Sequence, residues 1–236
     1  MNIIQFGAQP KSLGGKIGDL LKEEGHTVTN YDLAYGFDVT DEGCVKSIFN
    51  SNIPRVEVVI NYVGMMFNEN ISKMEVGDFK TVLNTNCLSL MILLKQSALY
   101  FQKNGNIPGR FIHIASNASI SGFSGMGAYC ASKFADIGLI QVAAKEWMKF
   151  GGVVNAISPG PFAPDSSEMS RNQVQQFMKM NNMDEKQAID MLVSRIPLKR
   201  LCTISDLYPL ISFLACDATD YITGQNFSLT GGMFMK

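Results

Sequence analysis

Short apolar runs with strand character recur along this chain, and stretches with helical periodicity separate most of them. The first run starts at the second residue. The expected strands are Asn2–Phe6, Thr27–Tyr31, Val56–Val63, Arg110–Ala115, Val153–Ile157 and Asn226–Leu229. Strands that alternate with helices build a parallel sheet, because each parallel connection has to cross back over a face of the sheet. This alternation is the strongest constraint on the fold.

The helical patterns agree with such a sheet. Leu13, Ile17, Leu20 and Leu21 are spaced along one face of a helix, and Gly25 is placed to end it. Further helices are expected over Asp41–Asn50, Asp78–Gln102, Ala128–Phe150 and Ser205–Cys216. We therefore expect an α/β fold with a doubly wound parallel sheet and helices on both faces.

Composition limits the function classes. The 236 residues suffice for one domain with a buried core, and no repeat or linker divides them, so we expect a single domain over residues 1–236. The net charge of −1 gives no general attraction to nucleic acid or anionic membranes, and no apolar run is long enough to span a bilayer. The N-terminus lacks a signal-like segment, so a cytoplasmic location is expected.

Cysteine and histidine give no sign of a metal site. The five cysteines are odd in number and match no metal-binding spacing, so we interpret them as free thiols in a reducing compartment. His26 and His113 lie on or beside expected strands, and we interpret both as structural. No metal is expected.

A glycine-rich turn from Gly7 to Gly18 follows the first strand and opens the first helix. Glycines let the backbone approach a pyrophosphate, and the helix N-terminus supplies free N–H groups; Ser12 can cap the helix and reach a phosphate. Asp32 ends the second strand, where a carboxylate binds the adenosine ribose and repels a 2′-phosphate. This predicts a site for NAD, with NADP as the alternative; an ordinary turn aspartate is the other interpretation of Asp32.

Tyr129 and Lys133 are four residues apart and so share one helix face. A nearby ammonium lowers the pKa of a phenol, which can then exchange a proton with a substrate oxygen. Ser116 directly follows an expected strand, at the edge where open α/β sheets bind ligands, and can hold that oxygen. The three residues suit hydride transfer at a carbonyl or alcohol carbon, with a nicotinamide carrying the hydride.

With these residues in place, the chain resembles the short-chain dehydrogenase/reductase family, and within it the compact 3-oxoacyl-carrier-protein-reductase-like group. The resemblance covers nearly the full length. The segments that carry it are Asp78–Asn86, Ala128–Lys133, Val154–Gly160, Ile196–Leu201, Phe213–Asp217, Tyr221–Gln225 and Gly231–Gly232. It implies a Rossmann fold in which residues 1–115 mainly bind the dinucleotide and residues 116–236 form the catalytic and substrate side.

The resemblance also implies roles for individual residues. Tyr129 would be the acid/base, Ser116 would steady the substrate oxygen, Lys133 would lower the tyrosine pKa and hold the ribose, and Asn86 would hold a water in a proton relay. The implied cofactor contacts are Gly7, Ser12, Leu13, Asp32, Asp38, Val39, Asn61, Tyr62, Val63, Tyr129, Lys133, Pro159, Gly160 and Phe162.

Several positions depart from the family pattern. Six residues separate Gly7 from Gly14, which leaves open which of the glycines 14, 15 and 18 faces phosphate. Tyr62 and Val63 replace the usual Asn-Ala, and Pro164 stands where a threonine often binds the carboxamide. Asp38 comes only six residues after Asp32, so no ordinary helix fits there and the adenine side is expected to be open. A non-catalytic nucleotide sensor or scaffold is therefore the alternative function, although the complete tetrad favours an enzyme.

The expected partner is a small carbonyl or alcohol compound. A ketone, a 3-oxoacyl thioester, a polyketide intermediate and a pterin all remain open. Residues 162–195 are rich in methionine and are expected to form either a mobile lid over an apolar substrate or a helical pair packed on the core. The long apolar helix around residues 88–99, together with the family habit, predicts a homo-oligomer, either a tetramer or a dimer.

Overall fold

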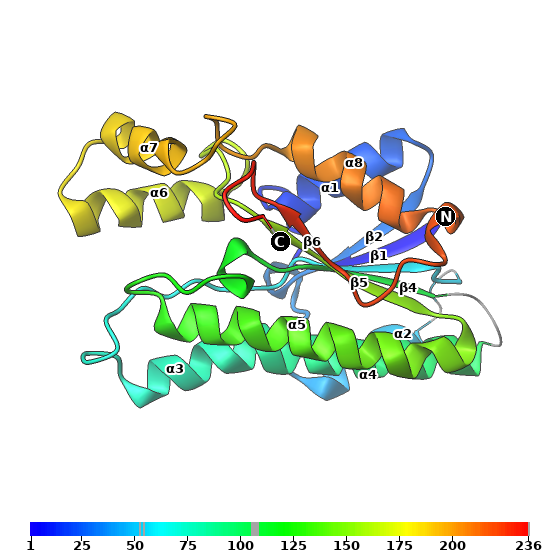
Figure 1. Cartoon of the computed structure of the whole chain (residues 1–236). Helices are drawn as coiled ribbons and strands as arrows, with labels where there is room; N and C mark the ends of the chain where they lie inside the picture. The colour runs from blue at the N-terminus through cyan, green and yellow to red at the C-terminus, as the bar shows by residue number, and fades with distance from the viewer. Residues whose placement is uncertain (52, 54, 105–108, 236) are drawn as a thin grey trace.

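The computed structural model describes residues 1–51, 53, 55–104 and 109–235 (Figure 1). Its strands are β1 (Asn2–Phe6), β2 (Thr27–Tyr31), β3 (Val58–Asn61), β4 (Arg110–Ile114), β5 (Val153–Pro159) and β6 (Asn226–Leu229). In the described chain they form one six-stranded sheet in the order β2-β1-β3-β4-β5-β6. Every neighbouring pair is parallel, which confirms the predicted parallel sheet.

Helices cover both faces of this sheet. They are α1 (Leu13–Glu23), α2 (Glu42–Asn50), α3 (Val76–Leu83), α4 (Ser89–Lys103), α5 (Gly127–Trp147), α6 (Glu168–Asn181), α7 (Glu185–Ser194) and α8 (Ile204–Ala215). α1 and α8 lie on one face, and α2, α4 and α5 lie on the other (Figure 1). The doubly wound α/β fold is therefore confirmed. None of the helices in the described ranges combines the length and apolarity needed to cross a membrane.

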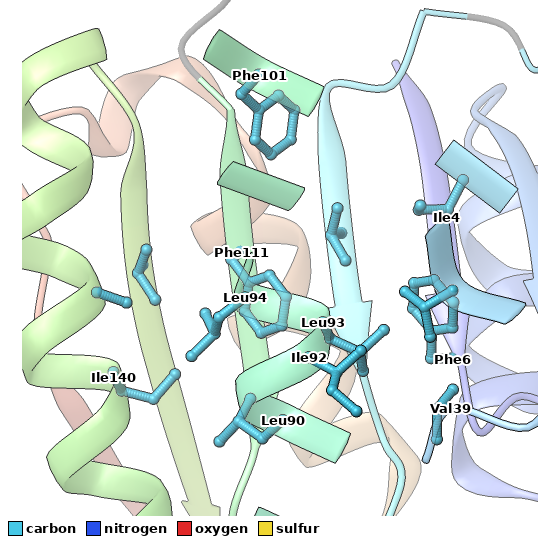
Figure 2. Packing of buried hydrophobic residues seen from close by; sticks show 14 of the residues in the cluster. Ile4, Phe6, Val39, Leu90, Ile92, Leu93, Leu94, Phe101, Phe111 and Ile140 are labelled. Atoms are coloured by element: carbon cyan, nitrogen blue, oxygen red, sulfur yellow. The ribbon is translucent and has the colours of Figure 1, made fainter. Parts of the chain in front are cut away.

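The alternation of side chains along each strand divides the core into two layers. Ile4 and Phe6 pack with Leu93 and Phe111 in the layer under α2, α4 and α5 (Figure 2). The intervening Ile3 packs with α1 and α8 on the opposite face. β3, β4 and β5 are buried along their whole length, which explains why they read as continuous apolar runs.

Three elements differ from their predicted bounds. The helix expected over Asp78–Gln102 runs from α3 into α4 through one π-helical segment, Asn84–Leu88. β3 is shorter than the predicted Val56–Val63, and the Asn61 side chain accepts a hydrogen bond from Val63 N just beyond its end (2.9 Å). β5 continues to Pro159, two residues past the predicted end.

The segment between β2 and α2 is as short as predicted. A single 3₁₀ turn, Leu33–Tyr35, links them, and the Asp32 side chain caps this turn by accepting from Ala34 N (2.9 Å). Because β1 has β2 on one side and β3 on the other, the chain leaves β1 and β3 in opposite directions. A crevice at the carboxyl ends of the strands follows from that switch. α6 and α7 stand beyond the same edge (Figure 1).

Candidate active site

A cleft of roughly 460 Å³ lies at the carboxyl edge of the sheet and holds most of the residues singled out from the sequence. Those that line it are Gly7, Ser12, Leu13, Asp32, Asp38, Val39, Tyr62, Val63, Ser116, Tyr129, Lys133, Pro159, Gly160 and Phe162. The glycine-rich turn, the ends of β3, β4 and β5, and the start of α5 thus meet around one space. Its size is ordinary for a small-molecule or cofactor site.

Two of the expected site residues, Asn61 and Asn86, do not line the cleft. Both side chains are completely buried beneath it. The Asn86 amide is fully used: Oδ1 accepts from Met65 N (2.7 Å), while Nδ2 donates to Met65 O (3.0 Å) and to Ser132 Oγ (2.8 Å). Asn86 lies in the π-helical segment, so its side chain ties that segment to α5 and to the loop after β3.

The glycine-rich turn is packed closely against the protein itself. Gly7 has a φ of 74°, and a Cβ there would lie 2.8 Å from Val63 N. At Gly15 it would lie 2.1 Å from Gln9 O, and at Gly18 it would lie 2.5 Å from Gln5 Nε2. These glycines therefore serve the close approach of helix, turn and strand. The cleft side of the turn is formed by Gly7, Gln9, Ser12 and Leu13.

Ser12 shapes this turn and caps α1. Its Oγ accepts from Gly15 N (3.1 Å) and donates toward the carbonyl oxygens of Gln9 (2.8 Å) and Gly7 (3.1 Å). The first turn of α1 carries no acidic residue. The positive end of this helix dipole therefore faces the cleft without a competing carboxylate on the helix, as anion binding requires.

Two carboxylates, those of Asp32 and Asp38, line the cleft beyond the end of β2. One oxygen of Asp32 caps the 3₁₀ turn, and one oxygen of Asp38 accepts from Thr40 N (2.8 Å) and Thr40 Oγ1 (2.7 Å). These bonds fix the orientation of both side chains while leaving an oxygen of each for a ligand. Among the described residues that line the cleft, Lys133 is the only lysine or arginine.

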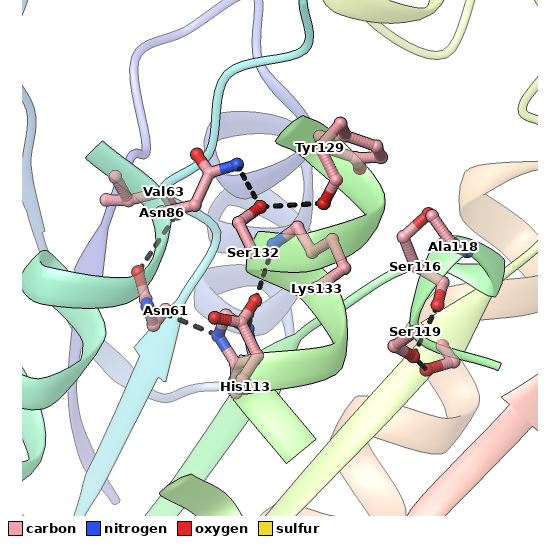
Figure 3. Close-up of polar contacts among 12 residues, drawn as sticks. Asn61, Val63, Asn86, His113, Ser116, Ala118, Ser119, Tyr129, Ser132 and Lys133 are labelled. Carbon is pink, nitrogen blue, oxygen red and sulfur yellow. Dashed lines mark hydrogen bonds and ion pairs between the residues drawn. The ribbon is translucent and has the colours of Figure 1, made fainter. Parts of the chain in front are cut away.

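Ser116, Tyr129 and Lys133 all line the cleft. Ser116 Oγ accepts from Ala118 N (3.1 Å) and so caps a short 3₁₀ turn that holds it at the end of β4 (Figure 3). The Lys133 ammonium lies 5.9 Å from the centre of the Tyr129 ring.

Lys133 is connected to a buried polar chain behind the cleft. Its Nζ donates to Asp136 Oδ2 (3.0 Å), which also contacts His113 Nε2 (2.9 Å). His113 Nδ1 in turn contacts Asn61 Nδ2 at 3.2 Å (Figure 3). All four residues are at most 2% exposed. Helix α5 and strands β3 and β4 are therefore joined through polar groups directly below the cleft.

The charges of Lys133 and Asp136 in this row of buried polar side chains stabilise each other. Burial acts against the ammonium of Lys133, but Asp136 and Tyr129 outweigh it and raise the lysine pKa above its ordinary value. Burial also acts against the Asp136 carboxylate, but Lys133 and His113 lower its pKa. Burial lowers the pKa of His113, so this imidazole is neutral near pH 7.

Asp136 was not among the site residues predicted from the sequence, and His113 was predicted only as a structural residue. The available signal was the i, i+3 spacing of Lys133 and Asp136 on one helix, together with a histidine inside an otherwise apolar strand. Ser167, Glu168, Met169, Ser170 and Gln173 also line the cleft and fall in the segment 162–195, which was predicted as a possible lid. Other lining residues that were not anticipated are Gln9, Leu33, Phe37, Thr40, Gly64, Thr85, Ile114, Ala115, Asn117 and Pro161.

The segment 162–195 forms the outer wall of the cleft through α6. Together with α7 it has a small core of its own, which includes Val174, Ala188 and Leu192. Three contacts tie it to the rest of the site: Lys16 Nζ to Asp165 O (2.6 Å), Glu168 N to Lys11 O (3.3 Å) and Asn68 Nδ2 to Gln176 Oε1 (2.9 Å). No cluster of potential metal ligands occurs among the residues that the structure covers.

Comparisons with known proteins agree with this geometry. Residues 8–234 match the family model described as enoyl-(acyl carrier protein) reductase. The 2-dehydro-3-deoxy-D-gluconate 5-dehydrogenase of Escherichia coli K12 is 32% identical over 181 residues, which are 77% of this chain and 66% of that one. The 3-oxoacyl-[acyl-carrier-protein] reductase of Rickettsia felis is 30% identical over 99% of this chain and 87% of its own.

Solved structures of the same fold exist. Sorbitol-6-phosphate 2-dehydrogenase from Erwinia amylovora superimposes with a TM-score of 0.91 at 24% identity, covering 99% of this chain and 100% of that one. The protein ElxO with NADP bound gives a TM-score of 0.83 at 25% identity, with 98% of each chain covered. The fold, the cleft that joins the glycine-rich turn to Tyr129 and Lys133, and these matches lead to one conclusion: the chain belongs to the short-chain dehydrogenase/reductase family of oxidoreductases.

Proposed function

We propose that this protein is an NAD-dependent oxidoreductase that interconverts a ketone and an alcohol on a small neutral molecule, with Tyr129 as the general acid/base. The observation that carries the proposal is the single cleft in which the glycine-rich turn, Asp32, Ser116, Tyr129 and Lys133 meet. A dinucleotide that spans this cleft reaches from a carboxylate at one end to the acid/base group at the other.

The residues present fit a dinucleotide. The part of the glycine-rich turn that lines the cleft and the N-terminus of α1 suit a pyrophosphate. Asp32 and Asp38 suit the hydroxyl groups of the adenosine ribose, and no arginine or second lysine of the described cleft residues is available to pair with a 2′-phosphate. These features support NAD over NADP.

In the proposed mechanism, bound nicotinamide supplies or accepts the hydride. Ser116 Oγ donates a hydrogen bond to the substrate oxygen and holds it near the phenol. Tyr129 gives its proton to that oxygen during reduction and takes it back during oxidation, and the Lys133 ammonium stabilises the phenolate left behind. Because both N–H donors of the Asn86 side chain are used within the protein, a relay water at Asn86 would donate to one of the oxygens of this residue.

The substrate end of the cleft favours an uncharged substrate. Met66, Phe162 and Met169 supply apolar surface, and Asn117 and Gln173 supply amides. The Lys133 ammonium is already paired with Asp136, so a substrate carboxylate or phosphate finds no free cation among the described lining residues. A 3-oxoacyl thioester remains the second candidate, because its phosphate would lie outside the cleft. The segment 162–195 then acts as the lid over the substrate.

The alternative of a non-catalytic nucleotide sensor loses support. The relatives named above are, by their names, dehydrogenases or a reductase, and the catalytic side chains of this chain face the same cleft as the glycine-rich turn. Conservation of fold alone would not decide this point. The meeting of Ser116, Tyr129 and Lys133 in one place is what favours the enzyme.

Titration of the protein with NADH and with NADPH tests the proposal, with nicotinamide emission and calorimetry as the readouts. Trp147 is a poor reporter because it is 2% exposed and packed among Phe101, Phe111 and Phe150. We expect tighter binding of NADH and loss of that preference in Asp32→Ala. Tyr129→Phe should abolish ketone reduction and leave NADH binding intact. Equal turnover by Tyr129→Phe, or no binding of either cofactor, would contradict the proposal.

We also propose that the protein is a homo-oligomer whose copies meet through α4 and α5. Large apolar side chains on the outer surface of these helices are Met91 and Leu99 on α4 and Phe134 and Val142 on α5, each between 38% and 54% exposed. A second copy of the chain would cover them. Sedimentation at working concentration should give a dimer or tetramer, and Val142→Glu should lower the mass; a monomeric wild type contradicts this proposal.

A further inference from the structure

The polar chain behind Lys133 has a fixed direction. Asn61 Oδ1 accepts from Val63 N (2.9 Å), so the Nδ2 of the same amide must face His113 and donate to its Nδ1 (3.2 Å). A neutral imidazole with Nδ1 as acceptor carries its proton on Nε2. His113 Nε2 therefore donates to Asp136 Oδ2 at 2.9 Å. Each link fixes the next, and the chain ends on a carboxylate that is not free to turn.

The carboxylate has one ionic partner. Asp136 is completely buried, and its second oxygen, Oδ1, contacts no hydrogen-bond donor in the part of the chain that the structure covers. Oδ2 receives both the neutral N–H of His113 and the ammonium of Lys133, at 3.0 Å. Since a buried carboxylate is stable only when it is paired, its charge is directed entirely at Lys133.

The negative charge of Asp136 stabilises the ammonium of Lys133 in turn. The lysine is 2% exposed, and a buried lysine without a counter-ion tends to lose its proton. An ammonium group has three donors. Asp136 takes one and so fixes the position of Nζ, 5.9 Å from the centre of the Tyr129 ring.

We propose that Asp136, held in place by His113 and Asn61, is a positioning residue that keeps Lys133 protonated and fixes its ammonium beside Tyr129, and thereby sets the pH at which Tyr129 exchanges its proton. This inference rests on the proposed acid/base function of Tyr129. It assigns a role to three buried side chains that do not touch the substrate.

The other titratable groups around Lys133 do not replace Asp136. Tyr129 on α5 is the group that responds, and His113 on β4 is neutral. Cys87, on the π-helical segment, has a pKa raised by burial and by Asp136, so it is a neutral thiol in the working range. Asp136 is thus the one carboxylate that contacts the ammonium within the described residues.

The decisive variant is Asp136→Asn, which keeps the side-chain shape and an oxygen that can accept from His113. Near-ultraviolet phenolate absorbance follows the tyrosines during a pH titration. Subtraction of the Tyr129→Phe titration curve from the wild-type curve leaves the absorbance change of Tyr129 alone. The same subtraction of the Asp136→Asn/Tyr129→Phe curve from the Asp136→Asn curve gives the titration of Tyr129 in the variant. We expect the Tyr129 pKa to rise by about one pH unit or more in Asp136→Asn, because Lys133 loses its charge near neutral pH.

A matched control removes a carboxylate from another i, i+3 lysine pair. Asp19 and Lys22 on α1 are 3.4 Å apart and both exposed, so Asp19→Asn should leave the titration of Tyr129 unchanged. The alkaline shift should also appear in the pH dependence of kcat, while KM for the ketone changes little. An unchanged or lowered Tyr129 pKa in folded Asp136→Asn would overturn the proposal. Lys133 would then stay protonated without Asp136, and the carboxylate would either partly cancel the effect of the ammonium on Tyr129 or have no effect on it.

A measurement on the wild-type protein covers the case in which Asp136→Asn does not fold. Carbon-13 NMR of the lysine side chains, with Lys133 assigned by its loss in Lys133→Met, should show Lys133 titrating above the ordinary value of 10.5. Titration below that value would refute the proposal. Neither the phenol titration nor the NMR experiment requires turnover, so a protein that reduces no ketone would refute the proposed function and leave this inference to be decided separately.

Discussion

Replacement of Gly15 by alanine tests the glycine-rich turn most directly. Gly15 lies in the first turn of α1, and a Cβ there would lie 2.1 Å from Gln9 O and 2.9 Å from Pro10 Cα. Ordinary van der Waals contact begins near 3.4 Å. The atoms in the way belong to the backbone, so no side chain can rotate to make room. The turn itself must move by roughly 1 Å, and overpacking of that kind costs about 1–3 kcal/mol.

The expected loss of stability is near the upper end of that range, partly offset by helix propensity. Alanine gains about 1 kcal/mol over glycine inside a helix. A backbone clash of about 3 kcal/mol therefore leaves a net loss of about 2 kcal/mol, which lowers Tm by roughly 4–8 °C in a domain of this size. Because Gln9 and Ser12 also line the cleft, NADH binding should weaken at least about tenfold, or about 1.4 kcal/mol.

Gly77→Ala is the matched control. Gly77 lies in the first turn of α3, is exposed, and has no atom within 4 Å of the added Cβ, so only the gain in helix propensity applies. Its Tm should rise by roughly 2–4 °C, with NADH binding unchanged. Thermal unfolding followed by circular dichroism and calorimetric titration with NADH measure both quantities. If Gly15→Ala were as stable as wild type and bound NADH equally well, the close approach of α1 to Gln9 could not be correct.

Three further predictions concern buried polar groups. Burial lowers the pKa of His113 below 6.5, so the unfolded chain binds more protons than the folded protein below that pH. The free energy of unfolding should therefore fall as the pH drops from 7 to 5, by up to about 1.4 kcal/mol per pH unit. Urea titrations of His113→Gln should show that this pH dependence is lost. Arg110 is 2% exposed and bonded to Asp217, Asp220 and Thr219, so Arg110→Ala should lower the free energy of unfolding by about 2 kcal/mol. Asp217→Asn should lower it by less than about 0.5 kcal/mol, because that carboxyl is 92% exposed. Comparable losses from both variants would show that the buried guanidinium of Arg110 is not the stabilising group. Burial and Asp206 raise the pKa of Cys202 to about 12, so this thiol should resist alkylation at pH 8, and rapid modification seen by mass spectrometry would contradict its burial.

The sheet and the cleft were predictable because local signals specify them. The strand at residues 2–6 followed by a glycine turn, the acidic end of β2, and the Tyr129–Lys133 spacing each depend on neighbours within a few residues. The short link between β2 and α2 followed in the same way, because Asp32 and Asp38 are too close together for a helix.

The features that escaped prediction depend on contacts between distant residues. The π-helical segment Asn84–Leu88 is fixed by the bonds of Asn86 to Met65 and Ser132, which are 21 and 46 residues away in the chain. The partners of His113 lie 52 residues before it and 23 residues after it. Nothing in the periodicity of β4 indicates that a histidine there faces a carboxylate on α5. The fold has to be known before such a pair can be identified.

The loop after β3 shows how a chain can keep its catalytic side chains while it changes the residues near its cofactor site. Asn61 turns inward to His113, and the Tyr62 ring packs against Gly14, whose added Cβ would lie 2.7 Å from it. Val63 contacts the glycine turn on one side, since a Cβ at Gly7 would lie 2.8 Å from Val63 N, and bonds Asn61 on the other. A continuous series of contacts therefore runs from the glycine-rich turn to Lys133. It passes through Val63, Asn61, His113 and Asp136. The turn that would hold the pyrophosphate is in this way connected to the lysine beside Tyr129. Of the two altered residues, Tyr62 packs on the glycine-rich turn and Val63 enters this path through its backbone N–H, so the departure from the family pattern leaves the support of Lys133 in place.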